Sequence, residues 1–249
     1  MTPYYEHAGI TIYHGDCRDV LTQVGPFDCV VADPPYGQTS LDWDVPVDGW
    51  LQFLPLKSSG SVWFFGSLRS FLASSSEFIG WTLAQDIVWE KHNGSNFHAD
   101  RFRRVHEQVA QWYRGAWEGV YKSPVFTMDA TARTARRKTR PPHTGHIEAT
   151  SYQSFDGGPR LQRSVIRVRS CHGYAENETQ KPIGILTPLI EYSCPPDGVV
   201  CDPFAGSGST GVAAKLLGRS AVLIEKREQQ CEIAAKRLSQ EVLPLEQAG

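Results

Sequence analysis

Two short segments of the sequence carry residues whose types and spacing suit chemistry on a ring-bound amine. The first is the tetrapeptide Asp33-Pro34-Pro35-Tyr36, which directly follows the apolar run Phe27–Ala32. Ring closure fixes the backbone at both prolines and leaves Pro34 without an N–H group. The Pro34 carbonyl can therefore stand as a fixed acceptor beside the Asp33 carboxylate. Two acceptors suit an –NH2 group on an aromatic ring, and Tyr36 offers a flat face on which that ring can stack.

An exocyclic amine on a nucleobase is a poor nucleophile because its lone pair is delocalised into the ring. Two acceptors that draw its hydrogens out of the ring plane would direct the lone pair at an incoming methyl group. A simple turn in which Asp33 caps a helix is the alternative. The position after an apolar strand favours chemistry, because α/β proteins bind ligands at the carboxyl ends of parallel strands. We therefore interpret Asp33, Pro34, Pro35 and Tyr36 as catalytic residues.

The second segment is a glycine-rich turn, Asp202–Gly211, between an apolar strand and a helix pattern. Gly206, Gly208 and Gly211 satisfy G-x-G-x-x-G, which permits a tight turn and a close approach of the backbone to a ligand. Glu225 lies 19 residues after Gly206 and ends the next apolar run. A carboxylate at that position can accept hydrogen bonds from ribose hydroxyls.

The residues before these glycines indicate which nucleotide-like ligand is bound. A dinucleotide would place a pyrophosphate here, but Asp202-Pro203-Phe204 puts a carboxylate at the strand end. That charge would repel a pyrophosphate and attract a cation. S-adenosylmethionine, with its ammonium, sulfonium and adenosine groups, fits better than NAD. The alternative is a glycine-rich turn that binds no ligand. If the loop does bind the cofactor, a side chain added at Gly208 is expected to block the pocket.

The elements that must position these segments alternate between strand and helix patterns, which favours a parallel α/β sheet. Between 116 and 172 the alternation stops, and the chain carries several Pro and Gly residues and the run RTARRKTR. We expect a long irregular insert there. The predicted strands are Ile10–His14, Phe27–Ala32, Gly60–Gly66, Trp81–Glu90, Val105–Tyr113, Gly198–Cys201 and Ser220–Glu225; the predicted helices are Trp50–Leu56, Leu68–Phe78, Ile183–Ser193, Thr210–Leu217 and Gln229–Leu238.

Charge is distributed unevenly along the chain. The 249 residues carry a net charge of −2, yet 101–170 holds 14 Lys and Arg against 5 Asp and Glu. A basic block within an acidic chain indicates a polyanion partner at one place, whereas the alternative is a solvated arginine-rich loop. The 41% hydrophobic content is that of a globular protein. Six scattered cysteines form no C-x-x-C pair, so no metal site or disulfide framework is expected. We also expect no membrane span, no signal peptide and a cytoplasmic protein.

In this order the motifs resemble the β-group of adenine-N6/cytosine-N4 DNA methyltransferases, in which the catalytic motif precedes the cofactor motif. VVADPPYG (30–37) resembles the catalytic motif, and DPFAGSGST (202–210) resembles the cofactor loop. TQKP (179–182) is similar to the motif before that loop, although many relatives have His-Pro where this chain has Glu-Asn-Glu. VLIEKRE (222–228) resembles the ribose-binding strand end, and HGDCRDVL (14–21) the segment that places an Asp near the cofactor adenine.

The resemblance implies a fold and a set of roles. The fold would be a circularly permuted, Rossmann-like methyltransferase domain, α/β, with a mostly parallel sheet and one antiparallel strand near Val105–Tyr113. Residues 1–115 would form the catalytic half, 116–172 a target-recognition insert and 173–249 the cofactor-binding half. Asp33, Pro34 and Tyr36 would hold a flipped base. The cofactor, S-adenosylmethionine, would be surrounded by Asp16, Lys181, Asp202, Phe204, Gly206, Gly208 and Glu225.

The implied reaction is methylation of adenine N6 in double-stranded DNA, in the manner of a restriction-modification enzyme. D-P-P-Y favours adenine, since relatives with S-P-P-Y more often modify cytosine N4. Cytosine-N4 methylation, methylation of an amide nitrogen or an RNA base, and a DNA-binding relative without catalysis remain alternatives. His106 and Glu107 are interpreted as structural polar groups, because the family works without a general base of that kind. Relatives are often dimers, so a homodimer is a further expectation.

The basic run of the insert yields a first prediction. Arg133, Arg136, Arg137, Lys138 and Arg140 lie within eight residues and are expected to bind DNA. Replacing Arg136, Arg137 and Lys138 with Ala should weaken binding to all sequences alike and flatten the slope of log K against log[salt] by up to ~3 units. Titrating duplex DNA at several salt concentrations measures the slope. An unchanged slope and site preference would mean that the run is only a solvated loop.

Overall fold

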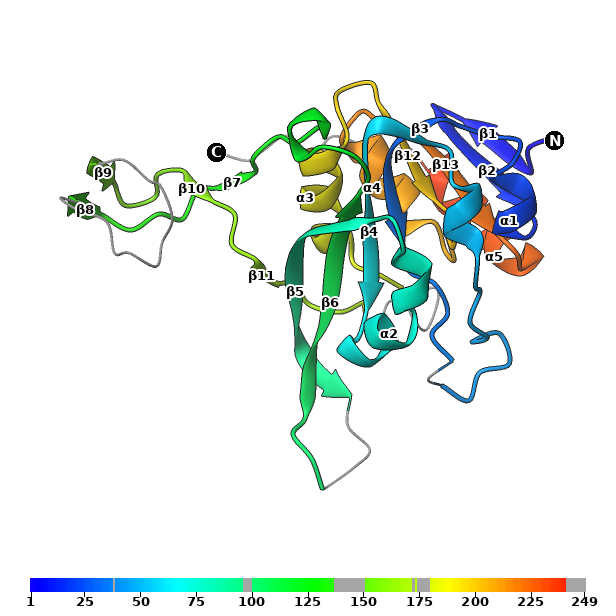
Figure 1. Ribbon diagram of the computed structural model, residues 1–249, viewed down its shortest axis with the longest axis horizontal. Coiled ribbons are helices and arrows are strands. Elements are labelled where there is room, and N and C mark those ends of the chain that lie inside the picture. Colours follow the sequence, from blue (N-terminus) through cyan, green and yellow to red (C-terminus); the bar gives the residue numbers. More distant parts are fainter. Residues whose placement is uncertain (38, 96–99, 137–150, 172, 174–179, 241–249) are drawn as a thin grey trace. The chain divides into compact units, whose positions relative to one another are not determined.

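The computed structural model describes residues 1–37, 39–95, 100–136, 151–171, 173 and 180–240 (Figure 1). The chain divides into two compact units. The first comprises Met1–Ser123 and Ser164–Gly249, and the second comprises Pro124–Arg163. Both motif segments singled out above belong to the first unit. The fold that positions them is therefore the fold of that unit.

The first unit is built on a nine-stranded sheet. Seven strands run in one direction, while β1 and β6 run against their neighbours. The predicted antiparallel strand near Val105–Tyr113 is confirmed as β6, and β1 is a second antiparallel strand at the sheet edge. The order is β1 (Tyr5–His7), β2 (Ile10–His14), β13 (Ser220–Glu225), β12 (Val199–Asp202), β3 (Phe27–Ala32), β4 (Leu56–Gly66), β6 (Arg104–Tyr113), β5 (Thr82–Ser95) and β11 (Val165–Arg167).

The permuted order of the motifs in the chain becomes adjacency in the sheet. β12, which precedes the glycine loop, lies between β3 and β13 and pairs with β3 in parallel. The two strand ends that carry Asp33 and Asp202 are therefore neighbours. All six residues of β3 are buried, because the sheet is covered on both faces. Five of the six residues are apolar accordingly. The exception is Asp28, whose carboxylate accepts hydrogen bonds from Lys57 Nζ at 2.8 Å and from the Val199 N–H at 2.9 Å.

Helices cover the two faces of the sheet. The side chains of α3 (Ile183–Ser193), α4 (Ser209–Leu216) and α5 (Glu228–Ser239) share one buried cluster with one face of the sheet. Side chains of α1 (Cys17–Val20) and of the 3-10 turns Trp50–Phe53 and Ser75–Phe78 share another cluster with the opposite face. α2 (Leu68–Ala73) follows β4 and begins with a capping box in which Ser67 is the N-cap residue. The result is a three-layered arrangement, and the predicted α/β class with a mostly parallel sheet is confirmed.

The predicted helix over Trp50–Leu56 is wrong. Only one 3-10 turn forms at Trp50–Phe53, and Leu56 already begins β4. Pro55 is the reason, since the residue before a proline is driven out of the helical region. Leu54 accordingly has an extended backbone, with ψ of 112°. The predicted helix over Leu68–Phe78 is likewise divided, ending at Ala73 before the 3-10 turn.

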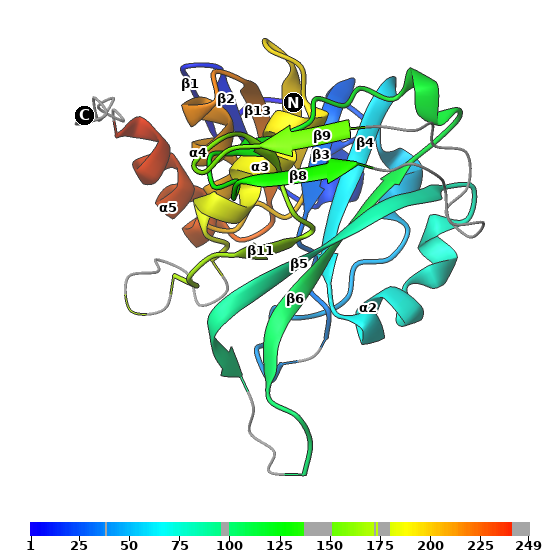
Figure 2. The ribbon, with the colours of Figure 1, turned by 90° about the vertical axis from the view of Figure 1, so that its left-hand side faces the viewer.

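The second unit contains regular structure that the sequence analysis did not predict for 116–172. β7 (Phe126–Thr127) pairs with β10 (Arg160–Leu161) in the antiparallel sense. β8 (Arg133–Arg136) pairs with β9 (Ser151–Ser154), also antiparallel (Figure 2). β11, also within 116–172, instead joins the main sheet in parallel with β5. Arg133 is exposed on β8. The predicted DNA-binding residues Arg137, Lys138 and Arg140 lie outside the described residues, as does Thr179 of TQKP.

Within the described residues, no helix is long and apolar enough to cross a membrane. The same residues contain no group of three or more His, Cys, Asp or Glu arranged to hold a metal ion. All six cysteines are free and buried.

Ser193 connects α3 to the centre of the sheet. Trp63 on β4 is 1% exposed, and its indole Nε1 donates to Ser193 Oγ at 2.8 Å. Ser193 Oγ in turn donates to the Leu189 carbonyl at 2.6 Å and lies 3.1 Å from Cys29 Sγ. The buried indole thus obtains its acceptor from a helix that packs on the sheet.

Ser193→Ala should therefore destabilise the fold. The substitution leaves the buried Trp63 N–H without an acceptor, which costs about 1–3 kcal/mol in the free energy of unfolding. Urea unfolding of both proteins measures the difference. Ser239→Ala is the matched control, because the Ser239 hydroxyl binds the Lys236 carbonyl at the exposed end of α5 and should change stability little. Equal stability of the two variants would contradict this assignment.

Candidate active site

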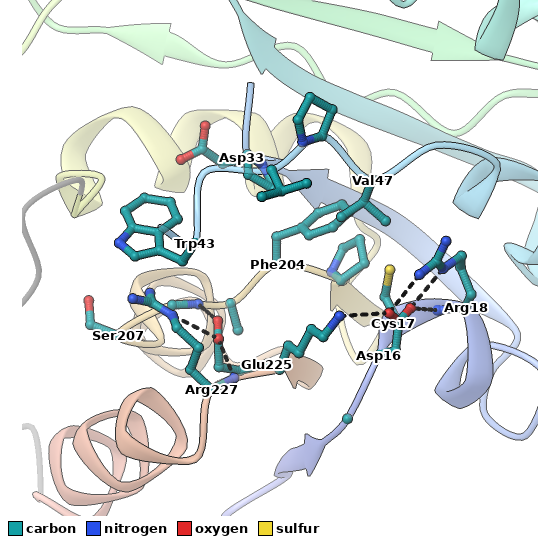
Figure 3. Close-up of a pocket in the computed structure, with 18 of the residues that line it drawn as sticks. Asp16, Cys17, Arg18, Asp33, Trp43, Val47, Phe204, Ser207, Glu225 and Arg227 are labelled. Atoms are coloured by element: carbon teal, nitrogen blue, oxygen red, sulfur yellow. Dashed lines mark hydrogen bonds and ion pairs between the residues drawn. The ribbon is translucent and has the colours of Figure 1, made fainter. Parts of the chain in front are cut away.

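A cavity of about 580 Å³ opens at the carboxyl ends of the parallel strands (Figure 3). It lies where the chain runs from β3 to β4 on one side and from β12 to β13 on the other, which is the switch point at which such sheets bind ligands. Its volume is within the usual range for small-molecule sites, roughly 300–1,000 Å³. The wall comes from Gly15–Arg18, the segment after β3, Gln180–Lys181, the glycine loop and the end of β13.

The glycine loop is fastened by two carboxylates beneath and beside it. Asp202 accepts the Phe204 N–H at 3.0 Å and the Thr210 hydroxyl at 2.5 Å. Burial raises the pKa of Asp202 to about 7, although these two hydrogen bonds oppose the rise. Glu225 accepts the Gly206 N–H at 2.8 Å. Asp202 is not among the residues that line the cavity, and its two hydrogen bonds shape the loop that does line it. Its direct contact with the cofactor stays a prediction.

Gly208 also serves the loop instead of lining the cavity. Its φ is +78°, and a Cβ built there would lie 2.9 Å from the Cβ of Ala234 on α5. A side chain at Gly208 would therefore press against α5, and the expectation that it would block the pocket is wrong. Gly206, in contrast, does lie in the cavity wall, with φ of +50°.

Carboxylates stand on two sides of the cavity. Asp16 caps α1 and is bound by the Arg18 guanidinium at 2.8 Å and by Lys226 at 3.3 Å. The hydrogen bonds from Arg18 outweigh the effect of burial and lower the pKa of Asp16. Glu225 is 8% exposed and also accepts the Arg227 N–H at 2.8 Å. Both carboxylates come from strand ends, so the sheet fixes their spacing.

Two aromatic side chains complete this wall. Phe204 is held edge-on by Trp50, with ring centroids 5.3 Å apart. Trp43 carries the Arg227 guanidinium over its ring at 4.6 Å. Figure 3 shows Trp43 and Phe204 lining the same cavity as Asp16. Sequence reasoning predicted Phe204 but missed Trp43, which stands in an irregular segment without any periodic pattern.

Asp33 occupies the far end of the cavity wall and is held from two directions. The Tyr36 hydroxyl donates to Asp33 Oδ1 at 2.5 Å, and Lys181 Nζ donates to Asp33 Oδ2. Lys181 Nζ also lies 3.5 Å from Glu107 Oε2, while Lys91 binds the other oxygen of Glu107. We call these five residues the ion chain: Tyr36, Asp33, Lys181, Glu107 and Lys91.

The charges of the ion chain are fixed by their neighbours. Burial alone would lower the pKa of Lys181, but the charges of Asp33 and Glu107 outweigh it and raise that pKa. Burial alone would raise the pKa of Glu107, but Lys181 and Lys91 hold it at about 2. Lys181 is therefore an ammonium and Glu107 a carboxylate at neutral pH. Burial and the nearby Asp33 charge raise the pKa of Tyr36, so its hydroxyl remains a donor.

The structure separates two residues that the sequence analysis treated together. His106 is exposed, whereas Glu107 is half-buried and lies 3.5 Å from the Lys181 ammonium that binds Asp33. No sequence spacing links Glu107 to the D-P-P-Y segment, because the antiparallel pairing of β6 with β5 and β4 brings it there. Of the predicted site residues, Asp16, Asp33, Pro35, Lys181, Phe204, Gly206 and Glu225 line one cavity.

A second cavity, of about 540 Å³, adjoins the first. Pro34 and Tyr36 line it together with residues of α2, and it shares Pro35, Pro46 and Val47 with the first cavity. The D-P-P-Y segment is therefore the partition between two hollows. Asp33 faces one of them and Tyr36 the other.

A permuted Rossmann-like sheet with this loop and this partition defines the methyltransferase class of fold. The chain belongs to the DNA methylase family of N6 and N4 amino-methyltransferases, whose sequence profile matches residues 27–236. S-adenosylmethionine is the methyl donor of this family. The family assignment confirms the resemblance drawn from the motifs.

Individual relatives agree with this assignment. The chain is 29% identical to type II methyltransferase M.HinfI of Haemophilus influenzae, over 92% of this chain and 68% of the relative. It is 27% identical to M2.LlaDCHI of Lactococcus lactis subsp. cremoris, over 95% and 92%. The fold is shared with M1.HpyAVI in complex with SAM (TM-score 0.62, 22% identity, 92% and 100% covered) and with the cytosine-N4-specific PvuII DNA methyltransferase (0.66, 15%, 97% and 90%).

Gly208→Ala tests the assignment of this glycine to packing. Gly218 offers a matched control, because its φ is +67° but no atom lies within 4 Å of a Cβ there. Both substitutions strain the backbone, and only Gly208→Ala also forces α5 to move. We expect Gly208→Ala to be less stable than Gly218→Ala by about 1–3 kcal/mol in urea unfolding. Equal stabilities would show that the contact with Ala234 is without consequence.

Proposed function

We propose that this protein methylates the N6 amine of adenine in double-stranded DNA, using S-adenosylmethionine and a base flipped out of the helix. The observation that carries the proposal is the position of Asp33. Its carboxylate is fixed by Tyr36 and Lys181 at the partition between the two cavities. A methyl donor in the first cavity and a base in the second would meet at that carboxylate.

The residues of the first cavity fit the proposed cofactor. Glu225 provides a carboxylate at a strand end for ribose hydroxyls, and Asp16 provides a second one on the adenosine side. Trp43 and Phe204 supply apolar and aromatic surface. Gly206 lets the backbone approach closely. When bound, S-adenosylmethionine supplies an electrophilic methyl group that an amino nitrogen attacks, leaving S-adenosylhomocysteine.

Asp33 can still receive the target amine while it is held. A carboxylate has about four acceptor sites, of which Tyr36 and Lys181 use two. The remaining sites can accept an amino hydrogen and draw it out of the ring plane. Lys181 is a cation and Glu107 is ionised down to a pKa of about 2, so neither is suited to take a proton. Asp33, which accepts the amino hydrogen, is the group of the ion chain through which the proton released after methylation leaves to water.

Cytosine-N4 methylation is the second candidate, favoured by the fold shared with the cytosine-N4-specific PvuII enzyme. One observation supports adenine over it. The first position of the tetrapeptide is Asp33, where the cytosine-modifying members of the resembling family more often have Ser.

DNA is proposed to be recognised partly by the second unit. Pro124–Arg163 lies within the predicted insert 116–172, which stands where the resembling family carries its target-recognition region. A base inside the stack cannot be reached, so flipping is implied at a cost of a few kcal/mol. We further propose that the protein forms a homodimer, since members of the resembling family are often dimers.

The direct test is methylation of a plasmid by the purified protein, followed by single-molecule sequencing. The expected result is N6-methyladenine at one short recurring sequence. N4-methylcytosine would establish the second candidate instead. No modified base, from a protein that binds S-adenosylhomocysteine in calorimetry, would overturn the proposal of catalysis.

Asp33→Ala separates chemistry from cofactor binding. The variant loses the proposed amine acceptor but keeps Glu225, Asp16 and the glycine loop. Turnover should fall by orders of magnitude, while the affinity for S-adenosylhomocysteine should stay within a few-fold of normal. Because Lys181 would lose its half-buried ion-pair partner, Asp33→Asn serves as a second variant of nearly equal size. Methylation at the normal rate by either variant would contradict the role given to Asp33.

A further inference from the structure

The hairpin formed by β5 and β6 carries an exposed aromatic side chain among arginines. Phe102 is 101% exposed, more than any other large apolar side chain in the described part of the chain. Arg101, Arg103 and Arg104 surround it in sequence and are all exposed. Arg101 is paired with Asp100 at 2.9 Å, so the group remains positive overall. Figures 1 and 2 both show the connected ends of β5 and β6 extending beyond the neighbouring strands of the sheet.

Strand directions place this hairpin end beside the proposed active site. β4 is parallel to β3, β6 is antiparallel to β4, and β5 is antiparallel to β6. β5 therefore ends at the same edge of the sheet as β3, which leads into Asp33. Phe102 lies five residues from Glu107, or ~17 Å along an extended chain.

The hairpin is also connected to that site by polar contacts. Lys91 on β5 and Glu107 on β6 form an ion pair, and Glu107 lies 3.5 Å from the Lys181 ammonium that binds Asp33. Nearer the end, the Arg103 guanidinium donates to the Gly94 carbonyl at 3.1 Å, which ties the two strands together. These contacts connect the strand that follows Phe102 to the ion pair that holds Asp33.

We propose that the segment Arg101–Arg104 binds duplex DNA next to the target base and that Phe102 inserts into the stack as the base leaves it. This inference rests on the proposed function. Guanidinium groups neutralise phosphates, and an apolar side chain wedged at a base step lowers the cost of unstacking. A flipped base leaves a gap that an aromatic ring can fill. Phe102 would act as a positioning residue, distinct from the groups that touch the amine.

The test uses a duplex carrying the site found by plasmid sequencing, in two forms. In one form the target base is paired, and in the other it faces an abasic position. Phe102→Ala should lower kcat/KM on the paired duplex by at least ~10-fold and have little effect on the other, where flipping is already cheap. Phe102→Leu, which keeps an apolar wedge, should retain most of the activity.

Ile79→Ala is the matched control. Ile79 is 82% exposed and precedes β5, at the opposite edge of the sheet. Equal activity of the Phe102→Ala and Ile79→Ala variants on the paired duplex would overturn the inference. An equal loss on both duplexes would overturn insertion, because it would place Phe102 in binding alone. A wild-type protein that methylates no DNA would instead overturn the proposed function, and the inference would fall with it.

Discussion

The parallel pairing of β12 with β3 is the constraint on which the site depends. Val200 pairs with Cys29 and Cys201 with Val30, although these residues lie in opposite halves of the chain. This register sets the ends of two buried strands next to each other at one edge of the sheet. Asp33 follows one end and the glycine loop follows the other. A shift of register would separate the proposed amine acceptor from the cofactor cavity, and both cavities depend on that alignment.

Half-buried charge at this edge is tolerated because each charged member of the ion chain has an opposite charge beside it. Removing one partner of such a group leaves an uncompensated charge, which is costly away from water. The chain of contacts from Lys91 through Glu107 and Lys181 to Asp33 therefore resists rearrangement. It connects β5, β6, the segment before α3 and the D-P-P-Y segment. Precise placement of a weak nucleophile needs this kind of support.

The residues in and around the glycine loop have two different structural roles. Asp202 and Gly208 build the turn from behind, whereas Phe204, Gly206 and Glu225 form the surface that a ligand would meet. Residues of one motif can thus be equally constrained for different reasons. Asp202 is required by the hydrogen bonds of the loop, and Gly208 by the approach of α5.

The sequence by itself determined the elements whose patterns are local. The bounds of β2, β3, α3 and β13 were predicted to the residue, because the spacing of apolar residues within each of these elements indicates whether it is a strand or a helix. The motifs likewise identified Asp33, the glycine loop and Glu225 as candidate site residues, because each motif is a short run of residues that are close together in the chain. The resemblance also supplied Asp16 and Lys181. Those inferences needed no knowledge of distant contacts.

Only the tertiary structure decided the rest. Glu107 joins Asp33 through strand pairing, Trp43 enters the cavity from an irregular segment, and β11 leaves the insert to extend the main sheet. Each of these depends on residues far apart in the chain, whose contacts leave no periodic trace in the sequence. Gly208 is a further example, because a glycine pattern indicates that another group comes close to the backbone but does not identify that group. Here the neighbour is a helix, not a ligand.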